Sequence, residues 1–133
     1  MNALRWTNPR SIDLSAPFVY YVRVVEPGVS EYRYIGKARN EARLREYVRN
    51  IEKISKGLRR GSKQQYRAVH LALAKACEFG WDYEMYPLES CTHDELLVRE
   101  RHHLAELRCN LNGARTWAID QYRQLSLCDL VGS

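Results

Sequence analysis

The chain has 133 residues, which is enough for one domain and too few for two of ordinary size. Its apolar fraction of 45% is typical of a globular protein, which argues against general disorder. The sequence contains no apolar run of the roughly 20 residues that a membrane span requires, and residues 1–17 lack the apolar core of a signal peptide. We therefore expect a cytoplasmic protein with no membrane partner.

Positive charge is concentrated in one stretch. The net charge is +5, and twelve of the 21 Lys and Arg residues lie between Arg33 and Arg67, together with only three Glu residues. A concentrated basic stretch favours binding to a phosphate backbone, although a solvated helix face produces the same pattern. The residues that we expect to contact the backbone of a nucleic acid are Arg39, Arg45, Arg49, Lys53, Lys56, Arg59, Arg60, Lys63 and Arg67.

The four cysteines are Cys77, Cys91, Cys109 and Cys128, and no two of them form a Cys-x-x-Cys pair. Cys91 and His93 are close in sequence, but no further ligand completes a zinc set. We therefore interpret the cysteines as reduced thiols that fill small spaces in the core.

A β-hairpin is the first predicted element. Residues from Phe18 to Val25 are rich in β-branched and aromatic side chains, which is typical of a strand. Pro27-Gly28 supplies the turn, and residues from Glu31 to Ile35 form the returning strand. We expect Gly36 to end the hairpin.

The periodicity becomes helical from about Asn40. A first helix is predicted to bury Leu44, Tyr47, Val48, Ile51, Ile54 and Leu58. Gly57 to Gly61 breaks this helix into a basic loop. A second helix is expected from about Gln64 to Phe79 and ends at Gly80. Its buried residues are predicted to be Tyr66, Val69, Leu73 and Ala76.

The second half of the chain adds a strand and two helices. Residues from Trp81 to Leu88 read as a third strand, in which Pro87 indicates an edge position or a strand end. Thr92 and Glu95 form a capping box that begins a helix from about His93 to Leu107. A final amphipathic helix is expected from about Trp117 to Leu127. This order predicts an α+β fold, in which a small three-stranded antiparallel sheet is flanked by helices and followed by an extra C-terminal helix.

Glu100 interrupts an apolar stripe on the third helix. The stripe is formed by Leu97, Leu104 and Leu107, and Glu100 lies between them at helical spacing. A carboxylate on such a face destabilises the folded state by about 3–5 kcal/mol unless it is neutralised, paired or bound to a metal ion. An ion pair with an arginine and a position at the rim of the stripe are the two structural alternatives.

Two tyrosines and a helix could meet at one end of the hairpin. Tyr20 and Tyr34 lie on adjacent strands, and Arg43 and Tyr47 share one face of the helix that follows, because they are four residues apart. Each of these tyrosines taken singly is more typical of a sheet aromatic with a satisfied hydroxyl.

Together these motifs resemble the signature of the GIY-YIG nuclease family, over most of the chain from Phe18 to Asn112. The matching segments, in order, are Val19-Tyr20-Tyr21, Tyr34-Ile35-Gly36-Lys37, Arg43-Leu44, Tyr47, Glu100 and Leu111-Asn112. The resemblance implies a nuclease domain over residues 18–112, preceded by a leader (residues 1–17) packed on the domain. Residues 113–133 form a helical extension of the same domain.

The chain departs from the family pattern at several positions. Phe18 and Val19 replace the first glycine and isoleucine of the family name, and Tyr47 stands where many members have histidine. Arg45 remains an alternative to Arg43, because the stretch after Gly36 is one residue shorter than the family pattern. Asn110 is likewise an alternative to Asn112.

The resemblance also implies a mechanism for hydrolysis of a phosphodiester bond. Glu100 would be the one protein carboxylate on a single Mg²⁺ or Mn²⁺ ion per active site, a hard cation that keeps most of its waters. Tyr20 would be the general base, assisted by Tyr34 or Lys37, and the phenolate would be favoured by Lys37 and Arg43. Arg43 would bind the non-bridging oxygens of the phosphate.

The remaining residues would orient the reactants. Tyr47 would orient the water or the phosphate, and Asn112 would position the metal-bearing loop or the phosphate. The function implied is that of a DNA endonuclease of restriction, phage or mobile-element type. A single active site cuts one strand, so double-strand cleavage requires a homodimer or two successive nicks. The alternatives are a nucleic-acid-binding module on the same fold that does not cut, and a basic RNA-associated scaffold.

Overall fold

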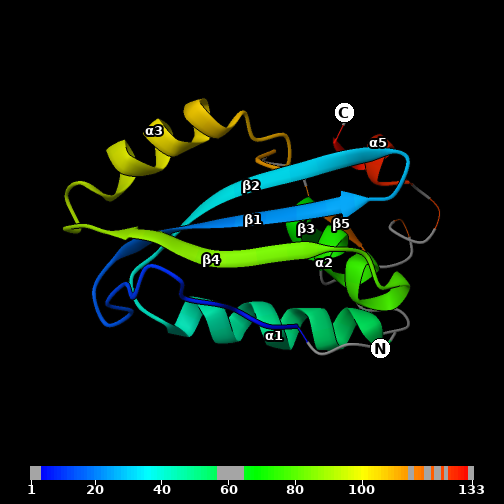
Figure 1. Ribbon diagram of the computed structural model, residues 1–133. Coiled ribbons are helices and arrows are strands. Elements are labelled where there is room, and N and C mark those ends of the chain that lie inside the picture. The colour runs from blue at the N-terminus through cyan, green and yellow to red at the C-terminus, as the bar shows by residue number, and fades with distance from the viewer. Residues whose placement is uncertain are drawn as a thin grey trace.

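The computed structural model of the protein describes residues 4–56, 65–113, 116–118, 121, 124 and 126–131. Its centre is an antiparallel sheet of three strands in the order β2-β1-β4 (Figure 1). The strands are β1 (Phe18–Glu26), β2 (Ser30–Ala38) and β4 (Tyr83–Ser90). Helices flank this sheet, so the predicted α+β fold with a three-stranded antiparallel sheet is confirmed.

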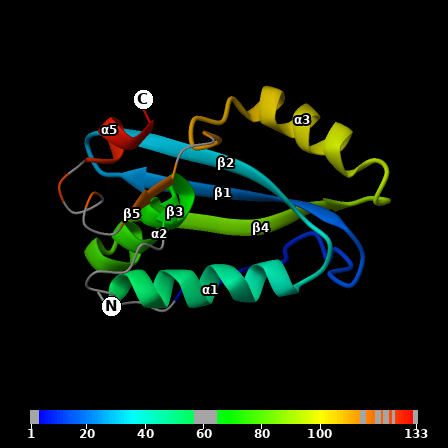
Figure 2. The ribbon, with the colours of Figure 1, turned by 180° about the vertical axis from the view of Figure 1, so that it is seen from behind.

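The two faces of the sheet are covered by different helices. Alternate side chains of β1 point to opposite faces, so Tyr20 and Val22 contact the core shared with α1 (Ala42–Ser55) and α2 (Ala68–Phe79). Tyr21 and its neighbours contact α3 (Leu96–Leu107) instead. Figure 2 views the molecule from behind, with α1 and α2 on the near side of the sheet. None of the helices within the described residues is both long enough and apolar enough to cross a membrane.

The hairpin is longer than the sequence predicts. β1 and β2 pair without interruption from Phe18 opposite Ala38 to Glu26 opposite Ser30. The turn contains Gly28 at a φ of +71°, a backbone conformation that glycine adopts without a steric penalty. Gly36 was expected to end the hairpin, but β2 continues through it to Ala38.

β4 occupies an edge of the sheet, as Pro87 predicts. Its pairing with β1 shifts between Val19 and Tyr20, where Val19 lies opposite Glu89 and Tyr20 lies opposite Pro87. The extra residue in β4 is a β-bulge beside the proline, which has no N–H group to donate to the ladder.

A second, two-stranded sheet joins distant parts of the chain. β3 (Gln65–Arg67) pairs with β5 (Thr116–Ala118), with Tyr66 opposite Trp117. The predicted second helix therefore begins at Ala68 rather than Gln64. Trp117, where the last helix was expected to begin, lies in a strand, whereas Gln121 and Gln124 within the expected range are helical. The pairing is non-local and buries both aromatic rings, so helical periodicity alone could not reveal it. A short C-terminal helix, α5, spans Leu127–Val131.

The buried faces of α1 and α2 agree with the prediction. The predicted loop at residues 57–61, together with the predicted buried residue Leu58, lies outside the described residues. On α1, Leu44, Tyr47, Ile51 and Ile54 are buried and Val48 is partly buried. Tyr66, Val69, Leu73 and Ala76 are buried too, and α2 ends at Gly80 with a φ of +70°. Most of the core lies between these two helices and the sheet.

α3 begins after the predicted capping box. The N–H of Thr92 donates to Glu95 Oε1 at 3.1 Å, and the N–H of Glu95 donates to Thr92 Oγ1 at 3.3 Å. The helix itself starts at Leu96 rather than His93. Its buried stripe also differs by one residue, because Leu96 is buried whereas Leu97 is 43% exposed.

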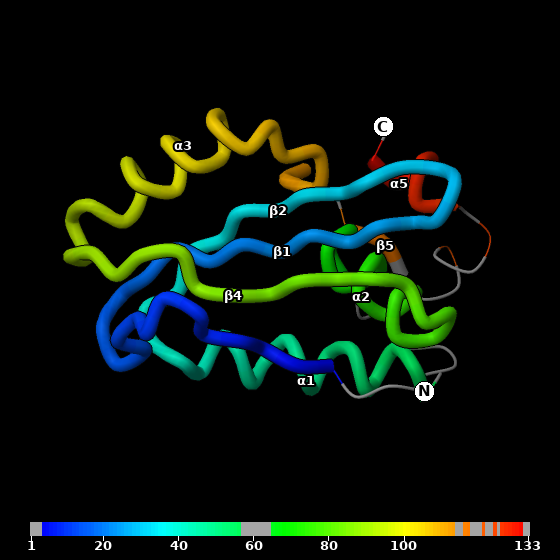
Figure 3. The backbone as a smooth tube through the Cα atoms, viewed as in Figure 1, coloured from blue at the N-terminus to red at the C-terminus, as the bar shows by residue number. Residues whose placement is uncertain are grey.

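The N-terminal segment runs along β4 and over α1 (Figure 3). The N–H of Thr7 donates to the carbonyl of Met85 at 3.0 Å, which extends hydrogen bonding beyond the edge of the sheet. The indole N–H of Trp6 donates to the carbonyl of Leu44 at 3.1 Å. Trp6 therefore joins the leader to the first helix.

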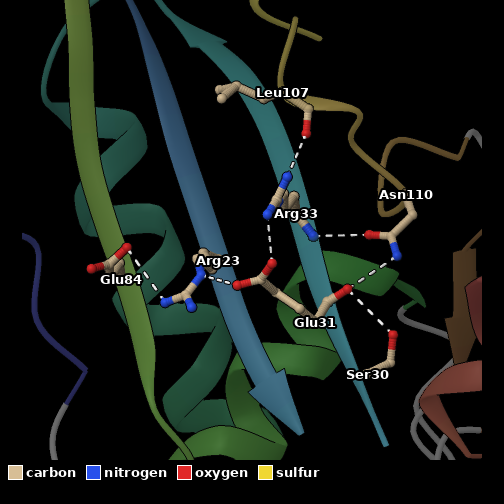
Figure 4. Close-up of polar contacts among 7 residues, drawn as sticks. All are labelled: Arg23, Ser30, Glu31, Arg33, Glu84, Leu107 and Asn110. Carbon is tan, nitrogen blue, oxygen red and sulfur yellow. Dashed lines mark hydrogen bonds and ion pairs between the residues drawn. The ribbon is translucent and has the colours of Figure 1, made fainter. Parts of the chain in front are cut away.

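The end of the sheet beyond α3 is covered by charged side chains (Figure 4). Arg23 pairs with Glu31 and lies 3.7 Å from Glu84, so its guanidinium joins β1 to both neighbouring strands. Arg33 pairs with Glu31 at 2.6 Å and donates to the carbonyl of Leu107 at 3.1 Å. Hydrogen bonds from Arg23 and Arg33 lower the pKa of Glu31. Arg33 thus serves the fold although it belongs to the basic stretch.

Candidate active site

Tyr20 and Tyr34 lie on the same face of the sheet, toward α1 and α2. Their ring centres are 6.2 Å apart, and both side chains are almost completely buried. The ring of Tyr20 crosses directly over Gly36, its partner in the neighbouring strand. A Cβ atom added at Gly36 would lie 2.2 Å from Cζ and 2.3 Å from the hydroxyl oxygen of Tyr20. Gly36 is therefore required by the close approach of the tyrosine.

Tyr47 brings a third hydroxyl to this cluster from α1. Its oxygen lies 2.8 Å from the hydroxyl oxygen of Tyr20. Trp6 packs edge-on against both rings, with centre-to-centre distances of 5.4 Å to each. Contacts from a strand, a helix and the leader thus fix the orientation of the hydroxyl pair.

A pocket of about 450 Å³ opens beside the tyrosines. Six of the seven predicted catalytic residues line it, namely Tyr20, Tyr34, Lys37, Arg43, Tyr47 and Glu100. They come from β1, β2, α1 and α3 and are separated by up to eighty positions in the sequence. The pocket is also lined by Glu46, Asn50, Gln65, Tyr66, Arg67, His70 and Thr116.

The charged residues at this pocket are only loosely paired. Lys37 Nζ lies 3.9 Å from Glu100 Oε1, and Arg43 lies 3.5 Å from Glu46. The side chain of Glu100 is 20% exposed and is four residues from both Leu96 and Leu104. Glu100 therefore shares a helix face with apolar residues, as predicted. It lies at the rim of that face, beside Lys37.

The structure distinguishes Arg43 from Arg45. Arg43 lines the pocket, whereas Arg45 is exposed and lies 3.5 Å from Glu41 on its own helix. Of the two candidates for the arginine at the site, the geometry favours Arg43.

Asn112 lies away from the pocket lining and binds the edge of the sheet. Its amide oxygen accepts from the N–H of Ile35 at 3.0 Å, and its amide nitrogen donates to the carbonyl of the same residue at 2.6 Å. Asn110 binds β2 in a similar way, accepting from the N–H of Arg33 at 2.8 Å (Figure 4). The two side chains hold the segment after α3 on β2, a positioning role with no direct access to the pocket.

The protonation of the tyrosines differs from the expectation. Burial raises the pKa of Tyr20 above its ordinary value of 10, and Arg43 only partly offsets this effect. Burial also raises the pKa of Tyr47 well above that value. Lys37 and Arg43 therefore do not make a phenolate of Tyr20 favourable here, because a fully buried anion loses more hydration than these cations return.

Two residues at the pocket were missed as candidates for chemistry. Arg67 Nη1 donates to the hydroxyl of Tyr34 at 3.1 Å. From the sequence, this arginine was expected only to contact the backbone of a nucleic acid. The ring of His70 lies 4.6 Å from the ring of Tyr47, and neither ring nitrogen has a hydrogen-bond partner within the described residues. Burial, followed by Arg67 and Arg43, lowers the pKa of His70 to about 4.

Only the long-range packing of α2 and β3 brings these two residues to the site. In the sequence, Arg67 was one basic residue among many, and His70 was one polar residue on an apolar helix. A histidine four positions after Tyr66, which pairs with Trp117, carries no local signal for a pocket.

The remaining basic residues divide into two groups. Arg39 and Arg49 line a neighbouring pocket of about 610 Å³, which shares Lys37, Arg43 and Glu46 with the first. Lys53 and Lys56 lie at the far end of α1, outside both linings. The predicted contacts at Arg59, Arg60 and Lys63 fall on residues outside the described part of the chain.

A single Mg²⁺ or Mn²⁺ ion is compatible with the residues at the pocket. Glu100 supplies a partly exposed carboxylate whose ion-pair partner among the described residues, Lys37, is 3.9 Å away. A hard cation that keeps most of its waters needs only one or two carboxylates, and the pocket has room for a hydrated ion. Glu100 would hold such an ion.

Comparisons with models of protein families, with curated proteins and with solved structures find no match for this chain. The chemical interpretation of the site therefore depends on its own residues and their geometry.

Proposed function

We propose that the protein is a divalent-metal-dependent DNA endonuclease of the GIY-YIG type. The observation that carries this proposal is the gathering of Tyr20, Tyr34, Lys37, Arg43, Tyr47 and Glu100 at one pocket. These are the residues to which the resemblance to the GIY-YIG signature assigns a common chemistry. A fold that used them only for packing would have no reason to bring a carboxylate, a lysine and an arginine to the same opening.

The cations at the pocket would bind the scissile phosphate. Arg43 and Lys37 have only weak partners in the carboxylates of Glu46 and Glu100, at 3.5 and 3.9 Å, so a phosphate can replace those contacts. Arg67 also lines the pocket, where it donates to the hydroxyl of Tyr34. A metal ion at Glu100 would stabilise negative charge on the phosphate.

The paired hydroxyls of Tyr20 and Tyr47 would orient the attacking water. Both are neutral at pH 7, because burial raises the pKa of each group. Tyr20 can accept the proton of the water only in its minor phenolate form. If Tyr20 is the base, the cleavage rate should therefore rise about tenfold per pH unit through the neutral range. A rate that is already independent of pH above about 5 would instead assign the base to a group such as His70, whose pKa is lowered to about 4.

The adjoining pocket would hold the flanking nucleic-acid backbone. Arg39 and Arg49 line it, and it shares the lining residues Lys37, Arg43 and Glu46 with the first pocket. Binding through several such cations releases counterions, so affinity should decrease steeply as the salt concentration rises.

Nicking of a supercoiled plasmid tests the function. The protein should convert plasmid to the nicked form with Mg²⁺ and not with EDTA, and Glu100→Gln should reduce the rate at least about 100-fold. Glu78→Gln, at an exposed carboxylate of α2, is the matched control and should retain the wild-type rate. Plasmid binding at low salt without cleavage under Mg²⁺ or Mn²⁺ would replace the nuclease with a non-catalytic DNA-binding module. Equal rates for Glu100→Gln and wild type would show that Glu100 does not bind the metal ion needed for cleavage.

A further inference from the structure

Two histidines and a glutamate gather on α3, away from the pocket. Within the described residues, His102, His103 and Glu106 form a group whose ligand atoms all lie within 4.8 Å of one another. His102 Nε2 lies 3.0 Å from Glu106 Oε2, one helical turn further along α3. Their side chains are 51% and 64% exposed, so an ion from solvent can reach them.

The spacing of these atoms fits a bound transition metal. With metal–ligand bonds of about 2.1 Å, neighbouring ligands are about 3.0 Å apart in octahedral geometry and about 3.4 Å apart in tetrahedral geometry. The separation between His102 and Glu106 is already in this range, and the ligand atom of His103 lies within 4.8 Å of both. Two imidazoles and one carboxylate suit Zn²⁺, Ni²⁺ or Cu²⁺, whereas Mg²⁺ prefers oxygen ligands.

A second carboxylate orients His103. Its Nε2 lies 3.1 Å from Glu89 Oε1 on β4, and Arg99 pairs with the same carboxylate. This contact leaves Nδ1 of His103 available as a ligand. A histidine whose other ring nitrogen is bonded to a carboxylate is the usual arrangement around protein-bound metals, because the carboxylate fixes the ring and increases its basicity.

We propose that His102, His103 and Glu106 bind one transition-metal ion of the Zn²⁺ class, at a site separate from Glu100. The ion links side chains one turn apart on α3, and through His103 and Glu89 it connects this helix to β4. The site therefore stabilises the helix that also carries Glu100. It does not depend on the proposed nuclease activity.

Calorimetric titration of the metal-free, reduced protein with Zn²⁺ tests the site. We expect one ion with a Kd in the micromolar range, and a rise in melting temperature of about 10 °C when Zn²⁺ is in hundredfold excess over Kd. His102→Ala and Glu106→Gln should each weaken binding at least tenfold. His93→Ala, which removes a different exposed imidazole, should leave the affinity unchanged.

Three results would overturn the proposal. They are no heat of binding with Zn²⁺ or Ni²⁺, equal affinities for wild type and His102→Ala, and loss of the site in Glu100→Gln. Titration with Co²⁺ gives a separate check on the ligands. Absorption typical of imidazole and carboxylate ligands supports the site, whereas an intense thiolate charge-transfer band would assign the ion to cysteines.

Discussion

The two faces of the central sheet are built differently. On the face toward α1 and α2, aromatic and aliphatic side chains form most of the buried core, and Tyr20, Tyr34 and Tyr47 are at most 5% exposed. On the opposite face α3 is the main cover, and Leu96 is its one fully buried residue. The first face holds hydroxyl groups rigidly in neutral form, and the second supplies charged groups that water can reach.

The candidate site forms where these faces meet at the edge of β2. Successive residues of a strand point to opposite faces, so Tyr34 belongs to the closely packed side and Lys37 to the side of α3. The pocket extends around this edge and joins the tyrosines to Glu100. We infer that the face toward α1 and α2 fixes the positions of the tyrosine hydroxyls at the site, and that the face toward α3 supplies its charged groups.

Gly36→Ala should have the largest effect, because it introduces a methyl group into the closely packed face. The new Cβ would lie 2.2 Å from Cζ of Tyr20, so the ring or the strand must move. We expect a loss of about 3 kcal/mol or more in the free energy of unfolding, measured by urea denaturation. Gly113→Ala is the control, because nothing lies within 4 Å of its added Cβ. The same cost in a Tyr20→Ala background would show that the tyrosine is not the obstacle.

His70 tests whether the closely packed face resists protonation. The pKa of His70 is lowered to about 4 from 6.5, with burial as the main cause, so the unfolded chain binds a proton that the folded chain does not. Tyr47, Tyr66, Arg43 and Arg67 surround the ring. Stability should therefore decrease as the pH falls from about 6.5 to 4, by an amount on the order of 3 kcal/mol.

His70→Gln should remove this part of the acid sensitivity. Chemical denaturation at pH 7, 5.5 and 4 would show a smaller loss for the variant than for wild type. His93→Gln, at an exposed histidine, should follow the wild-type curve. Parallel curves for His70→Gln and wild type would mean that His70 titrates normally.

Leu96 and Leu97 compare the buried and exposed sides of α3. Leu96→Ala should cost about 2 kcal/mol in the free energy of unfolding, near the lower limit for a buried leucine because α3 is thinly packed. Leu97→Ala should cost less than about 0.5 kcal/mol, because that side chain is 43% exposed. Thermal denaturation of both variants gives the difference, and a larger cost for Leu97→Ala than for Leu96→Ala would place the stripe where the sequence predicted it.

Tyr47→Phe should have the smallest effect of the four. It removes one hydroxyl of the buried pair and leaves that of Tyr20 without its 2.8 Å partner. The expected loss is about 1 kcal/mol in the free energy of unfolding. Tyr86→Phe on the α3 side serves as the control and should change stability by less than half as much. An unchanged stability for Tyr47→Phe would indicate that the pair makes no net contribution.

The sequence predicted the elements that depend on local patterns. The run of β-branched and aromatic residues from Phe18, the helical spacing from Leu44 to Ile54 and the capping box at Thr92 all record interactions between nearby residues. β3 and β5 were missed because Tyr66 and Trp117 are distant in the sequence, and their pairing overrides the helical pattern of each segment. The stripe on α3 was misplaced by one residue because Leu96 and Leu97 are equally apolar.

The candidate site shows the same division. Six of its residues were selected because their types and order suited one chemistry, and the structure brings them together. Arg67 and His70 were missed as partners because only the packing of α2 against α1 and β3 brings them near Tyr34 and Tyr47. Protonation could not be anticipated either, since the pKa of Tyr20 depends on how completely other segments cover it.

Both edges of the central sheet are already hydrogen-bonded to non-strand segments. Asn110 and Asn112 occupy backbone groups of β2, and Thr7 donates to Met85 on β4. A second molecule therefore cannot extend the sheet by adding a strand at these positions without first displacing such contacts. If two copies act together to cut both strands of a duplex, they should associate through helices and loops. The same covered edges protect the protein from aggregation into continuous intermolecular sheets.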